Sequence, residues 1–240
     1  MLSRTKLLAA LAAGLIVSTS AFAQPNQYDL DIYSTGINVD ANGTDLSYTY
    51  STDDIDNRLS ALSGQAVLAI EGVYPMTGAN WLLNDSQSKW ITPDSVINQG
   101  VGVDGFLAGS IWVYTTTFNV LDFTELNTVV ISGRWMVDNE GVDILLNGQS
   151  IGFGIANQEN IFTDWTDFEI SSAQGNNYAQ IGQNTLSFVV RNSLTTAGPS
   201  GLRVEMSGVA TAVPEPETWA MLLAGLGVVG AVTRRRRISA

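Results

Sequence analysis

Four side chains with oxygen ligands stand close together in the stretch "VDNEGVD": Asp138, Asn139, Glu140 and Asp143. Carboxylate and amide oxygens are the ligands that calcium prefers, and loops of extracellular modules often supply them. The spacing therefore suggests a calcium site just before a hairpin, with calcium as the one cofactor to test. A solvated turn is the alternative interpretation, because Asp and Asn are common in turns in any case.

The chain contains no histidine and no cysteine. Ser-His-Asp and Cys-His nucleophile systems are therefore absent, and so are zinc sites built from Cys and His. The sequence also shows no P-loop, nucleophile elbow or dinucleotide fingerprint. We expect no catalytic residues and a protein that is not an enzyme. Glycoside hydrolysis needs only carboxylates, so a carboxylate-dependent enzyme that acts on glycans stays open as the alternative.

Two tryptophans, Trp81 and Trp90, bracket the polar stretch of "WLLNDSQSKWITP". Exposed aromatic rings are rigid, amphipathic contact surfaces that anchor ligands and partners. Trp81 and Trp90 are therefore candidate ligand-binding residues that would stack on sugar rings. Packing at the edge of the domain is the competing interpretation. Trp112 and Trp135 lie inside apolar runs, and we expect both in the core.

The elements that position these residues read as β-strands. Alternating or β-branched apolar runs occur at 46–51, 66–74, 110–120, 128–137, 142–153, 165–170, 184–192 and 202–210. Asn147-Gly148 lies between two apolar runs, and this dipeptide predicts a type I′ hairpin turn. About eight short strands separated by Gly, Asn and Asp predict an all-β fold, a β-sandwich or jelly roll.

The order of motifs from Ser110 onward is similar to the jelly-roll modules of the galactose-binding-like superfamily, including modules attached to glycoside hydrolases. The motifs are "YTTTF", "GRWMVDNEGVDILLNG", "GQNTLSFVVRN" and "GPSGLRVEMSG". They follow one another as strand, acidic turn, hairpin and strands. The resemblance implies a jelly-roll ectodomain and makes polysaccharide an expected partner, although a fold does not fix a ligand.

The first 23 residues have the pattern of a secretory signal peptide. Basic Arg4 and Lys6 precede an apolar core over 7–17, and the small residues Ala21 and Ala23 frame a cleavage site. We therefore expect residues 1–23 to be removed during export.

Residues 24–212 form the expected ectodomain. They contain five basic and twenty-one acidic residues, a net charge of −16. Such a surface repels nucleic acid and favours solubility, so we expect no nucleic-acid partner. Without cysteine there are no disulfides, and stability must come from packing.

The chain ends in a motif, an uncharged run and a basic cluster. Pro214, Glu215 and Pro216 come first, and the two prolines predict an extended, exposed segment. The run 218–233 would be about 24 Å long as a helix, short of the ~30 Å apolar core of a bilayer. Interfacial anchors can still place it across a membrane. The basic cluster consists of Arg234, Arg235, Arg236 and Arg237, which favour the cytoplasmic side.

This tripartite tail, 213–240, resembles the PEP-CTERM sorting signal of Gram-negative bacteria. Its parts are the motif at 213–217, the single membrane-spanning helix at 218–233 and the basic tail at 234–237. The resemblance implies that an exosortase recognises Pro214, Glu215 and Pro216 and cleaves the transiently anchored precursor. It also implies delivery to the cell surface or to an extracellular matrix rich in exopolysaccharide, as in a biofilm. A purely structural component of such a matrix is a further alternative.

Overall fold

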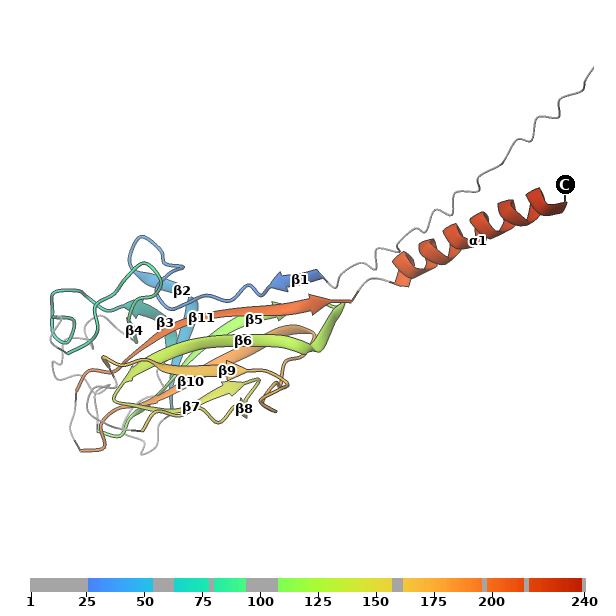
Figure 1. Cartoon of the computed structure of the whole chain (residues 1–240). Coiled ribbons are helices and arrows are strands. Elements are labelled where there is room, and N and C mark those ends of the chain that lie inside the picture. Colours follow the sequence, from blue (N-terminus) through green and yellow to red (C-terminus); the bar gives the residue numbers. More distant parts are fainter. Residues whose placement is uncertain are drawn as a thin grey trace, which may run out of the picture.

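We describe the protein from a computed structural model of the whole chain (Figure 1). The structure describes residues 26–53, 63–77, 80–93, 108–156, 162–195, 198–213 and 216–238. The expected signal peptide with Ala21 and Ala23 lies outside the described residues, and so do Pro214 and Glu215.

Among the described residues, eleven β-strands form one curled antiparallel sheet (Figure 1). The strands are β1 (Asn26–Asp29), β2 (Thr44–Asp53), β3 (Ser63–Leu68), β4 (Ile91–Thr92), β5 (Ile111–Val120), β6 (Thr124–Asp138), β7 (Glu140–Leu146), β8 (Gln149–Ser150), β9 (Thr166–Ile170), β10 (Gly182–Arg191) and β11 (Gly201–Ala212). Their order in the sheet is β8-β7-β10-β5-β2-β3-β4-β11-β6-β9, and β1 pairs with β11. The all-β prediction is confirmed, and the curled sheet fits a β-sandwich.

The core lies inside the curl of the sheet. Every second residue of β5, from Trp112 to Phe118, is buried, as the sequence pattern predicted. Trp135 of β6 and Phe168 of β9 lie 5.7 and 5.9 Å from the ring of Phe188 on β10. These aromatic contacts join the β6–β9 end of the sheet to its β10 region, and they close the curl around one hydrophobic core.

The predicted hairpin turn between β7 and β8 is confirmed. Asn147 and Gly148 have φ angles of 52° and 77°, as a type I′ turn requires. The Asn147 side chain also fixes the turn on the next strand, because its Oδ1 accepts a hydrogen bond from the backbone N–H of Thr185.

The C-terminal segment is helical. Helix α1 (Pro216–Ile238) includes the predicted span 218–233 and the basic cluster. No helix among the described residues is both long and apolar enough to cross a membrane. The expected single membrane-spanning helix is therefore not confirmed, and its uncharged run is indeed shorter than a bilayer core. The extended conformation expected for Pro216 is wrong, because Pro216 is the first residue of α1. Proline is favoured at this position, since a backbone N–H there would have no helical partner in any case.

Candidate functional site

Trp81 and Trp90 are not an exposed sugar platform. Their side chains are 1% and 0% exposed, and their rings stack on each other with centroids 4.2 Å apart. The indole N–H of Trp90 donates to the carbonyl of Leu82. A ring with no accessible face cannot stack on a ligand, so the prediction of ligand binding by this pair is wrong. The pair instead forms the centre of a second hydrophobic cluster, packed on the outer side of β6 against Met136.

Asp138 ends β6 and is buried beneath this cluster. Its Oδ2 accepts a 2.8 Å hydrogen bond from the indole N–H of Trp81. Burial raises the pKa of Asp138 to about 7, and the bond from Trp81 acts in the opposite direction. Asp138 therefore serves as a structural hydrogen-bond acceptor and does not face solvent as a metal ligand would.

The remaining members of the predicted calcium cluster also have other partners. Glu140 forms a bidentate ion pair with Arg191, with oxygen–nitrogen distances of 2.6 and 2.8 Å. Asn139 Oδ1 accepts a hydrogen bond from the backbone N–H of Ser193, and Asp143 Oδ1 accepts one from the N–H of Ile144. No three Asp or Glu side chains in the described part of the chain lie where they could hold a metal ion. The fold thus gives each of the four side chains a protein partner and does not gather three acids of this cluster around one ion position.

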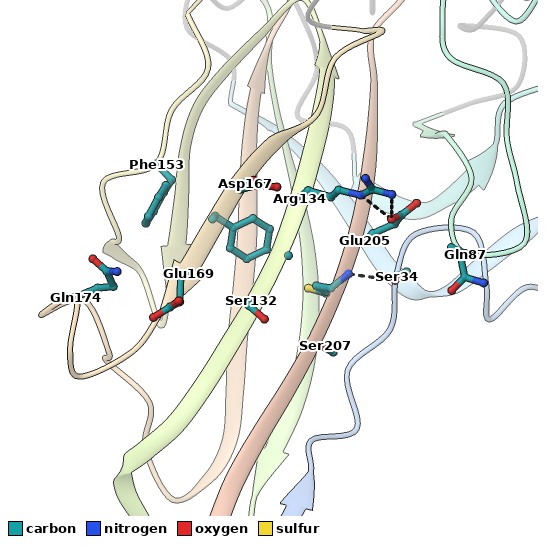
Figure 2. Close-up of a pocket in the computed structure, with 13 residues that line it drawn as sticks. Ser34, Gln87, Ser132, Arg134, Phe153, Asp167, Glu169, Gln174, Glu205 and Ser207 are labelled. Carbon is teal, nitrogen blue, oxygen red and sulfur yellow. Dashed lines mark hydrogen bonds and ion pairs between the residues drawn. The ribbon is translucent and has the colours of Figure 1, made fainter.

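The structure instead places an open groove of about 690 Å³ on the outer side of β9, β6 and β11 (Figure 2). Its lining residues are Ser34, Gln87, Ser132, Gly133, Arg134, Phe153, Asp167, Phe168, Glu169, Gln174, Glu205, Met206 and Ser207. Phe153 and Gln174 stand on one side of the groove, and Ser34 and Gln87 stand on the other.

Strand register arranges the floor of the groove in two polar rows. Arg134 of β6 lies opposite Asp167 of β9 and Glu205 of β11. Two positions along the strands, Ser132 lies opposite Glu169 and Ser207. Alternate residues of a strand share one face, so all six side chains point to the same side of the sheet. We call these six residues the polar face: Asp167, Arg134, Glu205, Glu169, Ser132 and Ser207.

Arg134 is held in place within the polar face. Its Nε and Nη2 lie 2.7 and 2.6 Å from Oε2 of Glu205. Its guanidinium also lies over the ring of Trp165, 4.5 Å from the centroid. A planar guanidinium favours such a combination of carboxylate and aromatic contacts, and the result is a fixed donor beside a half-buried indole.

Arg203 lies two residues before Glu205 on β11, and it binds the loop that precedes β4. Its buried guanidinium donates to Ser88 Oγ and to the carbonyl of Leu83, and it pairs with Asp85 at 2.8 Å. Ser88 in turn donates to Oε1 of Glu205. Burial lowers the pKa of Arg203, and the neighbouring Asp85 opposes that shift. The loop that precedes β4 is thereby attached to the strand that carries Glu205.

Chemically, the polar face offers fixed hydroxyl, carboxylate and guanidinium groups over an extended surface. Carboxylates accept and guanidinium groups donate hydrogen bonds, so the arrangement suits a ligand rich in hydroxyl groups. Sequence reasoning missed this site because it depends on strand order. One signal was available: residues 24–212 contain only five basic residues, and two of them, Arg134 and Arg203, interrupt apolar strand patterns.

The tail is described only in part. Arg234 is exposed within α1, and the structure gives no side-chain description for Pro216, Arg235, Arg236 or Arg237. The backbone N–H of Val213, the last residue before the predicted recognition motif, donates a 2.7 Å hydrogen bond to the carbonyl of Phe123. The motif therefore begins directly where the folded domain ends.

Comparison with known proteins bears on the tail. A beta-glucosidase from Kluyveromyces marxianus, solved in complex with glucose, matches 71% of this chain with 11% identity and a TM-score of 0.29. The chain spans 16% of that enzyme's length, and a TM-score this low supports no conclusion. A search of curated proteins found no match. The family described as the PEP-CTERM protein-sorting motif matches residues 212–237. The chain therefore carries a PEP-CTERM sorting motif at its C-terminal end, which marks it as an exported protein processed by an exosortase.

Proposed function

We propose that this chain is the precursor of a non-enzymatic cell-surface or matrix protein whose β-domain binds polysaccharide. The signal peptide at 1–23 starts export, and the apolar run at 218–233 holds the precursor at the membrane until exosortase acts at Pro214, Glu215 and Pro216. The observation that supports this delivery route is the sorting motif at 212–237.

The binding site of this proposal is the polar face. It is the floor of an open groove with room for several sugar units, and its side chains come from three adjacent strands, which hold them rigidly. Three carboxylates and one guanidinium give it a net negative charge, and residues 24–212 carry −16 in all. Like charges repel, so the ligand class that fits is a neutral polysaccharide. We assign the domain to the galactose-binding-like jelly rolls as part of this proposal.

Binding is favoured over catalysis by the place of the perturbed acids. Glycan-cleaving enzymes keep one carboxyl protonated at the site of reaction. Among the carboxyl groups that the structure describes, burial raises the pKa of Asp45 and Asp138. Neither residue lines the groove, and each accepts structural hydrogen bonds, Asp45 from the backbone N–H groups of Gly36 and Ser47.

The binding half is tested with the mature protein released from its own bacterium. The protein is co-sedimented with the exopolysaccharide of that bacterium, and tryptophan emission is recorded, because Trp165 contacts Arg134, which lines the groove. We expect co-sedimentation that weakens at least tenfold in Arg134→Gln and Asp167→Asn. The matched control is Arg191→Gln, which breaks an ion pair outside the groove. Equal binding by all variants, or none by the wild type, contradicts the proposal and favours a purely structural role. Shortening of the polysaccharide would indicate the enzyme instead.

The delivery half is tested in cells with Glu215→Ala. We expect the full-length precursor to accumulate in the membrane fraction while the folded domain stays protease-resistant. Normal release of the variant would contradict recognition through this motif.

A further inference from the structure

Both ends of the folded domain leave it at the same place. Strand β1 pairs antiparallel with β11, and Asn26 lies opposite Ala212. The described chain therefore enters the sheet at Asn26 and leaves it at Ala212 at the same end of the sheet. Figure 1 shows β1 beginning beside the end of β11, on the side from which α1 extends.

Three exposed apolar side chains gather at this end. Leu121 and Phe123 belong to the turn between β5 and β6, and Val213 follows β11; their exposed fractions are 38%, 43% and 48%. We call these three residues the apolar tip.

The apolar tip is tied firmly to the sheet. The N–H of Val213 donates to the carbonyl of Phe123, and the N–H of Thr124 donates to the carbonyl of Leu121. The hydroxyl of Tyr28 on β1 accepts a hydrogen bond from the N–H of Leu121 and also bonds to the hydroxyl of Thr124. These bonds present the three side chains on a fixed surface and not on a loose loop.

The distance between the apolar tip and the C-terminal segment is limited by the chain itself. Helix α1 begins at Pro216, so only two residues separate it from Val213. A residue spans at most about 3.6 Å, which keeps Val213 within roughly 11 Å of the first residue of the helix. A surface that meets the first turn of that helix must therefore lie next to the apolar tip.

We propose that the apolar tip rests on the lipid interface of the membrane that holds the C-terminal segment of the precursor. The proposal builds on the membrane attachment in the proposed function. Apolar side chains gain free energy by entering the headgroup boundary, and a short tether makes even a weak contact effective. Asp122 and Glu125 lie at the same end of the domain, so zwitterionic lipid is the favoured surface, because anionic lipid would be repelled.

Because the chain has no cysteine, one introduced thiol can report on this contact. The full-length precursor, after removal of its signal peptide, is reconstituted into phosphatidylcholine nanodiscs with an environment-sensitive dye at Phe123→Cys. The matched control is Ser86→Cys. It lies two residues from Ser88, whose hydroxyl bonds to Glu205, and Glu205 is seven residues along β11 from Ala212, about 23 Å. Leu121→Cys provides a second reporter in the apolar tip.

We expect the dyes at 121 and 123 to shift to the blue and to be quenched by nitroxide-labelled lipid, while the dye at 86 stays in water. If the precursor fails to co-purify with nanodiscs, the membrane attachment itself is wrong and the inference fails with it. If the precursor co-purifies but the dyes at 121 and 123 behave like the dye at 86, only the lipid contact is overturned. A blue shift of the dyes at 121 and 123 that appears only when exosortase is added would also overturn the lipid contact. It would indicate that the apolar tip binds the peptidase.

Discussion

The indole N–H of Trp81 donates a 2.8 Å hydrogen bond to Oδ2 of Asp138, and this bond joins the segment before β4 to the end of β6. The other carboxyl oxygen, Oδ1, is buried without a hydrogen-bond partner in the described part of the chain. Burial is the larger influence on this group, and it raises the pKa of Asp138 to about 7. The fold therefore favours a protonated carboxyl next to the stacked tryptophans.

The first prediction concerns pH and Asp138. Between about pH 4, the ordinary pKa of Asp, and pH 7 the folded chain holds a proton that the unfolded chain has lost. The contribution of this residue to stability therefore falls as pH rises through that window, by up to about 1.4 kcal/mol per pH unit. Asp138→Asn keeps an oxygen acceptor for Trp81 but has no proton to lose. The free energy of unfolding in urea, measured at pH 5 and at pH 8, should fall less with rising pH in the variant than in the wild type. An equal change in the two proteins would refute the assignment.

The second prediction separates two arginines that both contact Trp165. The side chain of Arg203 is 0% exposed, and Arg203→Leu leaves Asp85 without its cation and the hydroxyl oxygen of Ser88 without its donor. Removing one partner of a buried ion pair costs about 3–5 kcal/mol, although Asp85 is half exposed and can regain water.

Arg134→Leu is the matched control for Arg203→Leu. Its side chain is 45% exposed, and an exposed ion pair contributes about 0–1 kcal/mol. The free energy of unfolding in urea measures both variants. Similar losses in the two would show that Arg203 is not the attachment point of the loop before β4.

Most strand positions were predictable because alternating or β-branched apolar runs mark them, and in β5 and β10 the pattern matches burial residue by residue. The strand predicted at 66–74 is only partly right, because β3 ends at Leu68 and the apolar side chains of Ile70 and Tyr74 beyond it are exposed. Strands β1 and β4 escaped prediction, because four and two residues show no period. The prediction of exposed rings for Trp81 and Trp90 was wrong because it was based on the polar residues between them. Those residues bond to the protein itself: Asn84 Oδ1 accepts from the N–H of Trp90, Asp85 Oδ1 accepts from the N–H of Gln87, and Ser88 donates to Glu205 on β11.

The polar face could not be predicted, for a different reason. Residues 134, 167 and 205 share a surface only because β6 lies between β9 and β11. That strand order depends on pairing between segments far apart in the chain, which a local sequence pattern does not show.

The third prediction tests close packing beneath the polar face. A Cβ atom at Gly133 would overlap the backbone oxygen of Glu205 and the side chains of Met206 and Phe168. Gly133→Ala should therefore destabilise the fold by about 1–3 kcal/mol, the usual cost of overpacking. Gly198→Ala is the control, because no atom lies within 4 Å of its Cβ position, and its effect should stay within about 0.5 kcal/mol. Thermal unfolding measures both, and an unchanged melting temperature for Gly133→Ala would mean that β6 and β11 are not so closely paired.

The fourth prediction concerns calcium. A bound ion stabilises the folded state by mass action, by about 2.7 kcal/mol at a hundred times its Kd. In this fold the acids of the 138–143 cluster already have partners, and Glu140 is engaged by Arg191 through both oxygens. We therefore expect the same melting temperature in millimolar calcium and in chelator, with magnesium as the control for ionic strength. A rise that calcium alone produces, and that Glu140→Gln abolishes, would mean that the Arg191 ion pair opens to admit the ion and that the acidic cluster is a metal site after all.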